Sequence, residues 1–271
     1  MNSNVIPLTP LDLSVAASLV VILAVLTWYL KLGMSYRVLV AGVRTVVQLL
    51  LLGLVLEYLF ATSHPLLIGA IALTMLAIAG REVMARQQRP FKGIWGYGLG
   101  TLSMFISSFA ITVFSLNVIV GPDPWYLPQY AIPLLGMMLG NTMTGVALTL
   151  DNLTQNAWQQ RAIIEQRLML GEDWRSAIRE ISRQSLRTGL IPIVNSMAAA
   201  GIISIPGMMT GQVLAGSSPM DAAKYQILIM FMITAGTGFA TVLSSWLGAK
   251  RLFDERHRLR LERLQQFDGV S

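Results

Sequence analysis

The sequence predicts an all-α polytopic integral membrane protein, and three observations lead to this fold class. Hydrophobic residues make up 54% of the 271 residues and charged residues only 13%, against the roughly 25% usual in soluble domains. Apolar runs fill most of the chain, and a run of about 20 residues crosses the hydrocarbon of a bilayer as a helix. A helix also satisfies its backbone hydrogen bonds internally, as hydrocarbon requires. We therefore expect a single membrane domain over residues 1–271.

The apolar runs predict about seven transmembrane helices. The first run lacks a basic segment before it and is too long for a cleaved signal, so we expect it to be retained. The second and third follow after short connections, and GPDPWYLPQ separates the fourth from the fifth. The sixth is expected to end at Pro206 and Gly207, because proline removes a backbone donor. The expected spans are residues 12–30, 38–60, 65–85, 95–120, 129–150, 187–205 and 222–248.

Basic residues alternate between the connections of these spans. The connections after the first, third, fifth and seventh spans carry lysines and arginines, and the others carry almost none. Because basic connections stay in the cytoplasm, we expect the N-terminus outside, the C-terminus inside, and a basic cytoplasmic tail at residues 249–271. The formal net charge of +6 then comes from topological anchors that also favour anionic membrane lipid. We expect no nucleic-acid partner.

The longest connection, residues 151–187, is expected to form a cytoplasmic region of two short helices. The break between them is expected at residues 171–173, whose aspartate suits an N-cap. In the second helix Trp174 and Ile178 lie on one face, and Arg175 begins a basic row on another. This helix either lies on the anionic inner leaflet or offers a docking surface to a cytoplasmic partner.

Polar side chains inside the spans are the candidates for a translocation pathway. Arg44 and Gln48 lie one turn apart in the second span and project from the same face. A cation at this depth needs partners or water, so Arg44 either lines a cavity or snorkels to the headgroups. Asn141 and Thr142 in the fifth span, and Asn195 in the sixth, either pack helices together or line a translocation surface.

The sequence gives no support for enzyme or cofactor chemistry. The chain has no cysteine, no GxxxxGK[ST] phosphate loop, no HExxH and no paired carboxylates within a span. We therefore expect a transport protein without a cofactor and not an enzyme. Met208 and Met209 are adjacent, and thioethers suit copper(I), but methionine is also the usual filler of apolar gaps. Any metal-binding residues stay unknown from the sequence.

Three segments, AGVRTVVQLLLLG, PLLGMMLGNTM and IPGMMTGQVLAG, resemble the FetB family of membrane permeases, which belong to an ABC-type iron exporter. The resemblance covers nearly the whole chain. It implies an ABC permease domain in the bacterial inner membrane, a permease homodimer, a separate FetA-like ATP-binding subunit, and export of iron. Plant relatives are linked to aluminium tolerance and to sugar nucleotides. An exporter of another solute therefore stays open, as do a secondary carrier and a membrane scaffold.

The resemblance to ABC permeases also implies a coupling region within residues 151–187. Glu165 and Gly171 keep the spacing of the EAA motif, although its usual downstream LP pair is absent. A glycine break between short helices gives a compact knob on which an ATP-driven subunit can push. The expected coupling residues are Glu165, Gly171, Trp174, Arg175 and Ile178.

Residues 207–219 are expected to dip into the membrane as a short re-entrant segment that forms an extracellular gate. The alternative is an ordinary apolar outer loop. Gly207 permits the turn, and Gln212 is expected to satisfy backbone groups that leave the helix. With Met208 and Met209, these residues are the gate candidates of the pathway.

Overall fold

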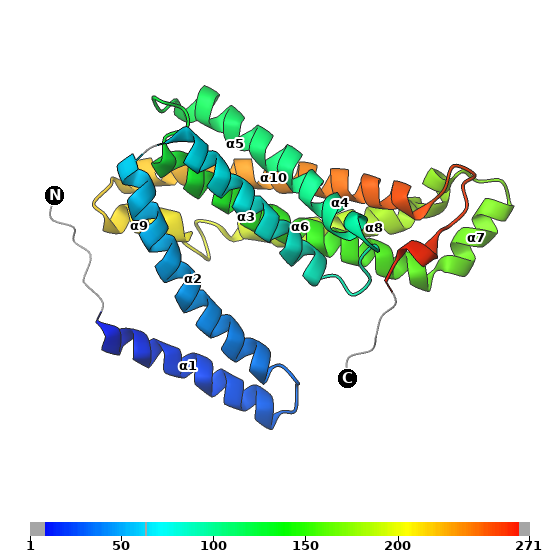
Figure 1. Cartoon of the computed structure of the whole chain (residues 1–271), viewed down its shortest axis with the longest axis horizontal. Coiled ribbons are helices and arrows are strands. Elements are labelled where there is room, and N and C mark those ends of the chain that lie inside the picture. Colours follow the sequence, from blue (N-terminus) through cyan, green and yellow to red (C-terminus); the bar gives the residue numbers. More distant parts are fainter. Residues whose placement is uncertain (1–8, 63, 266–271) are drawn as a thin grey trace.

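The computed structural model describes residues 9–62 and 64–265, and the elements assigned there are all helical (Figure 1). Two of them, η1 and η2, are π-helical turns within one long segment, and η3 is a 3₁₀ turn. The elements in chain order are α1 (Pro10–Tyr29), α2 (Ser35–Thr62), α3 (Pro65–Ala85), α4 (Ile94–Met104), η1 (Phe105–Phe109), α5 (Ala110–Phe114), η2 (Ser115–Val120), α6 (Pro128–Gln159), α7 (Arg161–Met169), α8 (Trp174–Ala199), α9 (Gly207–Leu214), α10 (Pro219–Leu252) and η3 (Leu261–Arg263).

Helices α6, α8 and α10 pack along one another at the centre, with α3 and α4 beside them (Figure 1). Small residues allow this close packing. A Cβ atom at Gly189 of α8 would lie 1.9 Å from Thr149 Oγ1 and 2.7 Å from the carbonyl oxygen of Gly145 on α6. The two backbones therefore nearly touch, which favours dispersion contacts between helices in a membrane. Polar bonds add to the packing, since Ser107 Oγ donates to the carbonyl oxygen of Gly236 at 2.7 Å.

The predicted all-α membrane fold is confirmed, and within the described residues all but one of the about seven predicted spans have the length and hydropathy of a membrane-crossing helix. Six segments within the described residues are long and apolar enough to cross a membrane. The expected sixth span, 187–205, is not among them. The helix at this place is α8, which begins earlier and ends at Ala199, and its first half carries a row of arginines from Arg175 to Arg187. Only its second half is apolar, which is too short to span hydrocarbon alone.

Helix α8 nevertheless returns the chain along the bundle. The end of α6 and the start of α10 lie at opposite ends of the molecule, and α8 runs between them against both helices (Figure 1). If the N-terminus lies outside and the C-terminus inside, the chain must cross the membrane an odd number of times. The return through α8 must then complete a crossing. That orientation stays a prediction.

Two breaks were expected around α8. The structure confirms the one before this helix and corrects the one after it. The break at residues 171–173 is confirmed, since α7 ends at Met169, Gly171 has φ of +91° and the Asp173 carboxylate accepts the Ser176 N–H at 3.0 Å. The helix after this break is α8, which is longer than the short helix that was expected. The expected end of the sixth span at Pro206 and Gly207 is wrong, because the helix already stops at Ala199. Pro206 is instead the N-cap residue of α9.

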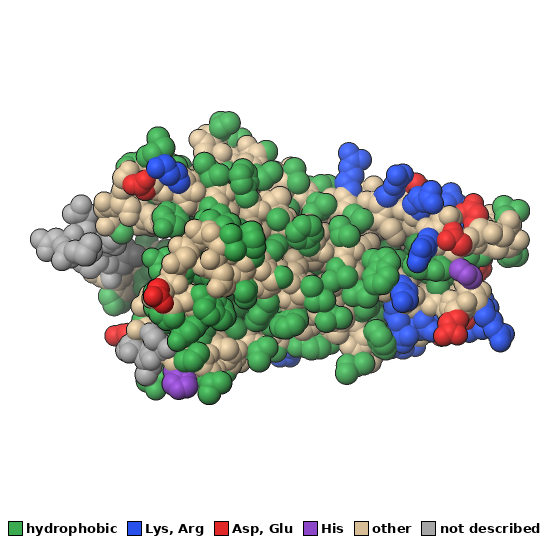
Figure 2. All heavy atoms as spheres, turned by 90° about the horizontal axis from the view of Figure 1, so that it is seen from above, with side chains coloured by type: hydrophobic (Ala, Val, Ile, Leu, Met, Phe, Trp, Pro, Cys, Tyr) green, Lys and Arg blue, Asp and Glu red, His purple; other side chains and the backbone are tan. Residues whose placement is uncertain are grey.

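Helices α1 and α2 form a hairpin that leans away from the central bundle (Figure 1). Large apolar side chains cover both helices and are mostly exposed, including Val43 and Leu50. On the face drawn in Figure 2, hydrophobic side chains cover the middle of the molecule, and Lys and Arg gather at the end where α7 lies. This apolar belt is the surface that lipid or another helix covers in a membrane protein.

The expected basic tail at residues 249–271 is, where described, an ordered part of the basic end. Helix α10 continues to Leu252, and residues 253–265, named here the C-terminal strap, fold back to the connection between α3 and α4. Gln265 N–H donates to the Pro90 carbonyl oxygen at 2.9 Å, and Lys92 N–H donates to that of Arg263 at 2.7 Å. Phe91 is buried beneath these bonds in one apolar cluster with α7 and α8. Residues 266–271 lie outside the described residues.

Candidate functional site

Arg44 lies in a cavity of about 630 Å³ between α2, α3 and α6, named here the Arg44 cavity. Its guanidinium forms an ion pair with the Glu82 carboxylate of α3. Gln48 lines the same cavity, one turn along α2. Both predicted residues therefore face one hollow, and the lining role considered for Arg44 agrees with this position.

Glu82 was missed by sequence reasoning, although the signal was present. An arginine at membrane depth needs a counter-charge, and Glu82 lies within the apolar third span, near its basic end. Arg37 and Arg86 also line the Arg44 cavity. Three arginines and one glutamate therefore line the cavity, which carries an excess of positive charge.

The polar residues predicted on α6 and α8 are not brought into this cavity. Thr142 is fully buried, where its Oγ1 donates to the Met138 carbonyl oxygen at 2.8 Å and lies 3.2 Å from Ser108 Oγ. Asn141 is exposed, and its Nδ2 donates to its own helix at 2.9 Å. Asn195 is exposed on α8. These positions agree with the packing alternative for Thr142 and leave the two asparagines as surface groups.

Two of the gate candidates line a second cavity, named here the α9 cavity. Met208 and Gln212 line it together with Tyr130 of α6 and Tyr225 of α10, and its volume is about 470 Å³. Gln212 Oε1 is buried and has no hydrogen-bond partner within the described residues. The expectation that this side chain satisfies freed backbone groups therefore has no support at its oxygen. An unpartnered buried carbonyl is instead an acceptor left available to a ligand or water.

The other two gate candidates lie outside the α9 cavity. Gly207 is exposed at the start of α9, and Met209 is half-buried beside the cavity lining. No group of three or more His, Cys, Asp or Glu side chains gathers anywhere in residues 9–62 and 64–265. The residues that would bind a metal thus stay unknown.

Helix α7 and the turn to residue 173 form a protrusion at the basic end, named here the knob (residues 161–173). Met169 and Leu170 at its tip are 81% and 84% exposed. Glu165 and Gly171, predicted as coupling residues, are exposed on the same protrusion. Sequence reasoning missed the apolar tip, although MLGED shows two large apolar residues directly before a turn.

The remaining coupling candidates lie directly after the knob, at the start of α8. Ile178 is 2% exposed and packs in the cluster that joins α7, α8 and the C-terminal strap, so it cannot touch a partner directly. Trp174 is half-buried against Phe253, with 5.8 Å between ring centroids, and its backbone N–H donates to His257 Nδ1 at 3.3 Å. Arg175 is exposed, with its guanidinium 5.4 Å from the Trp174 ring centroid. The knob is therefore fixed to the strap.

The family described as "Uncharacterised protein family (UPF0014)" matches residues 10–253. The chain is 37% identical to UPF0014 membrane protein slr1647 of Synechocystis over 88% of this chain and 90% of that protein. It is 32% identical to the Probable iron export permease protein FetB of Escherichia coli over 98% and 100%. It is 31% identical to the Protein ALUMINUM SENSITIVE 3 of Arabidopsis thaliana over 90% and 88%. No solved structure matches the chain.

Proposed function

Because the chain belongs to the UPF0014 family of membrane proteins, we propose that it is the membrane-spanning permease of an ATP-driven ABC exporter, with iron as its cargo. The assignment of iron and of export comes from the relative named as a probable iron export permease, which aligns along its whole length. On this proposal the chain works as a homodimer in a bacterial inner membrane, and a separate ATP-binding subunit supplies the energy.

The observation that carries this proposal is the apolar tip of the knob. Met169 and Leu170 are exposed at the end of α7, and α7 lies at the end of the molecule where Lys and Arg gather, away from the apolar belt that lipid covers (Figures 1 and 2). Exposed apolar groups rimmed by polar ones mark protein interaction sites, and the exposed Glu165 lies one turn before Met169 on α7. The ATP-binding subunit would hold this tip.

The knob is also built to transmit force. Its helix α7 is packed on α8 through Ile164, which is 1% exposed, and α8 continues directly into the bundle centre. A push on the tip would therefore move α8 against α6, because the two backbones are in contact at Gly189. This gives closure of the ATP-binding subunits a rigid path to the Arg44 and α9 cavities.

A second cargo class is favoured by the charge of the Arg44 cavity. Three arginines facing one glutamate attract anions, and guanidinium groups suit phosphate and carboxylate oxygens. An anionic solute such as a sugar nucleotide, or iron carried in an anionic chelate, fits this charge better than a bare cation. A secondary carrier is the third possibility, and Glu82 is the carboxylate that such a carrier would use.

Reconstitution decides between these functions. Proteoliposomes containing the permease with and without its ATP-binding subunit are loaded with ferrous iron, ferric citrate or a sugar nucleotide, and transport is followed with and without ATP. ATP-dependent iron transport supports the proposal. Transport of equal rate without the subunit would assign a secondary carrier, and ATP-dependent transport of the sugar nucleotide alone would replace iron as cargo.

The docking role of the knob has its own variant pair. Leu170→Asp places a charge at the apolar tip and should abolish capture of the ATP-binding subunit. Ile202→Asp is the matched control, because Ile202 is 88% exposed in the turn that follows α8, at its other end. Equal capture by both variants would show that the knob is not the docking site.

A further inference from the structure

The C-terminal strap forms one wall of an open cavity of about 670 Å³ beside the start of α4 and the end of α10, named here the strap cavity. Trp95 and Leu99 of α4 contribute apolar wall. Five basic side chains line the rest, namely Lys250, Arg251, Arg256, Arg258 and Arg263, against the carboxylates of Asp254 and Glu255. The strap cavity therefore carries an excess of positive charge.

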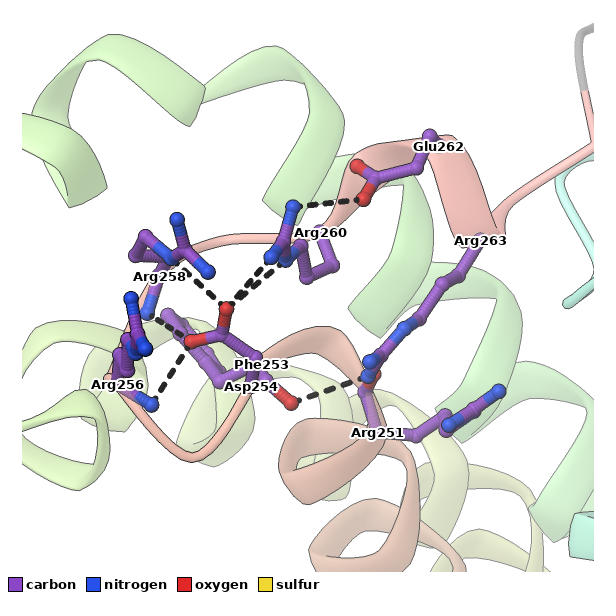
Figure 3. A network of polar contacts seen from close by, with 8 residues as sticks. All are labelled: Arg251, Phe253, Asp254, Arg256, Arg258, Arg260, Glu262 and Arg263. Atoms are coloured by element: carbon purple, nitrogen blue, oxygen red, sulfur yellow. Dashed lines mark hydrogen bonds and ion pairs between the residues drawn. The ribbon is translucent and has the colours of Figure 1, made fainter.

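The Asp254 carboxylate is already saturated by the strap itself (Figure 3). Its Oδ2 lies 2.9 Å from Arg258 Nε and 2.8 Å from Arg260 Nη2. Its Oδ1 accepts the backbone N–H groups of Arg256 and Arg258 at 3.0 and 2.8 Å. Burial alone would raise the pKa of Asp254, but these hydrogen bonds outweigh it and hold the pKa well below its usual range. This carboxylate therefore has little capacity to neutralise the other cations.

Lys250 and Arg251 have no carboxylate partner in the part of the chain that the structure describes. The Arg251 guanidinium lies 4.4 Å from the Trp95 ring centroid and points away from Asp254 (Figure 3). Its Nε is buried and has no hydrogen-bond partner within the described residues. A charged group with an unsatisfied donor is unfavourable, and an anion held by the part of this guanidinium that lines the strap cavity would offset that cost.

The strap cavity lies at the boundary of the apolar belt. Ile94 and Trp95, in the first turn of α4, are 80% and 46% exposed, and Trp246 of α10 is 48% exposed beside Lys250. Tryptophan is enriched where a membrane meets water. Basic pockets between transmembrane helices on the cytoplasmic side bind the headgroups of anionic lipids. The position therefore favours a ligand with both a phosphate and apolar chains.

We propose that the strap cavity binds the phosphate of an anionic phospholipid headgroup. The Arg251 guanidinium donates to the phosphate oxygens, Lys250 adds a second cation, and the acyl chains lie on the exposed apolar surface beside Trp95 and Ile94. Arginine suits this role because its planar fork matches the geometry of phosphate oxygens. A soluble phosphate would use the same two cations but leave the apolar surface uncovered.

A bound headgroup would stabilise the support of the knob. Phe253 and His257 of the C-terminal strap hold Trp174, the first residue of α8. Neutralising the cations at the strap would reduce their mutual repulsion and keep these contacts closed. The lipid binding itself does not depend on the proposed function, and its test needs no ATP-binding subunit.

The test uses the full-length permease, purified in detergent and depleted of lipid. Phosphatidylglycerol, phosphatidylcholine or inorganic phosphate is added at matched ionic strength, and binding is measured by the shift in Tm and by native mass spectrometry. The cavity variants are Arg251→Met, Arg251→Lys and Lys250→Met. Arg187→Met is the matched control, because Arg187 is an exposed cation of α8 outside the strap cavity.

We expect phosphatidylglycerol to raise the Tm of the unaltered protein more than phosphatidylcholine does, and inorganic phosphate to have no such effect. Affinity for phosphatidylglycerol should fall about tenfold in Arg251→Met, less in Arg251→Lys and Lys250→Met, and not in Arg187→Met. An equal fall in Arg187→Met would show diffuse attraction and overturn the site. A full shift with inorganic phosphate would overturn the lipid assignment. Should Arg251→Met fail to fold, unchanged affinity in both other cavity variants overturns the proposal.

Discussion

Replacing Glu82 by glutamine removes the counter-charge of Arg44 and keeps the size of the side chain. Loss of one partner costs about 0–1 kcal/mol for an exposed ion pair and about 3–5 kcal/mol for a buried one. The side chains of Arg44 and Glu82 are 51% and 28% exposed. We therefore expect a loss of about 1–3 kcal/mol, between these limits. At roughly 2–4 °C per kcal/mol, the fall in Tm is measurable.

The assay is thermal unfolding of the purified permease in a double-mutant cycle of Arg44→Gln and Glu82→Gln. The double variant should be more stable than the sum of the single changes predicts, because neither charge is then left alone. Glu180→Gln is the matched control, since the ion pair of Glu180 with Arg183 is about 70% exposed on both sides. Additive single changes, or an effect no larger than the control, would refute the reasoning.

A further variant at Arg44 separates stability from transport. If Arg44 lines the pathway, Arg44→Met should insert normally yet lose export, because it removes the charge and keeps the apolar bulk. Export that persists in this variant would mean that Arg44 serves only to hold α2 against α3.

Three further predictions concern the knob, the α9 cavity and the strap. Gly171→Val should weaken capture of the ATP-binding subunit, because φ of +91° strains a β-branched residue, whereas Gly171→Asn should weaken it less; pull-down measures both. Gln212→Leu should lower export without lowering Tm, because the buried Oε1 has no hydrogen-bond partner to lose within the described residues, and Met208→Leu should change neither; a Met208 variant that alone loses export would indicate sulfur ligation. Asp254→Asn should lower Tm at neutral pH. The lowered pKa of Asp254 in the folded state means that its contribution is present above about pH 4 and is lost as the pH falls further, so the two proteins should converge in acid.

Hydropathy predicted most of the fold, since six of the seven apolar runs lie in helical segments that begin close to the expected residues. The exception was α8, where the continuous apolar run begins only in the second half of a helix that starts at Trp174. Burial against α6 and α10 makes a helix there, and tertiary packing of this kind has no signal in a hydropathy average. The end of the helix at Ala199 depends on the turn that follows, in which Gly201 has φ of +82°.

The sequence predicted the arrangement of candidate-site residues only where they lie close together along the chain. Arg44 and Gln48 share a face because helical spacing requires it, and Asp173 caps α8 as its position indicated. Glu82 was not predicted, because its pairing with Arg44 depends on how α2 and α3 align. Ile178 was expected at a docking surface, but one apolar stripe can face either a partner or the protein core, and the strap covers this one.

The outward-leaning hairpin has a consequence for how the protein is made. Helices α1 and α2 pack mainly on each other, so they can pair in the membrane while later residues are still on the ribosome. Glu82 follows Arg44 by 38 residues, which at bacterial and eukaryotic elongation rates takes about 2–8 s. During that interval Glu82 has not yet been made, and the Arg44 side chain would reach for the headgroups. Snorkelling and ion pairing are then successive states of one residue, and the arrival of α3 is the event that draws Arg44 into the cavity.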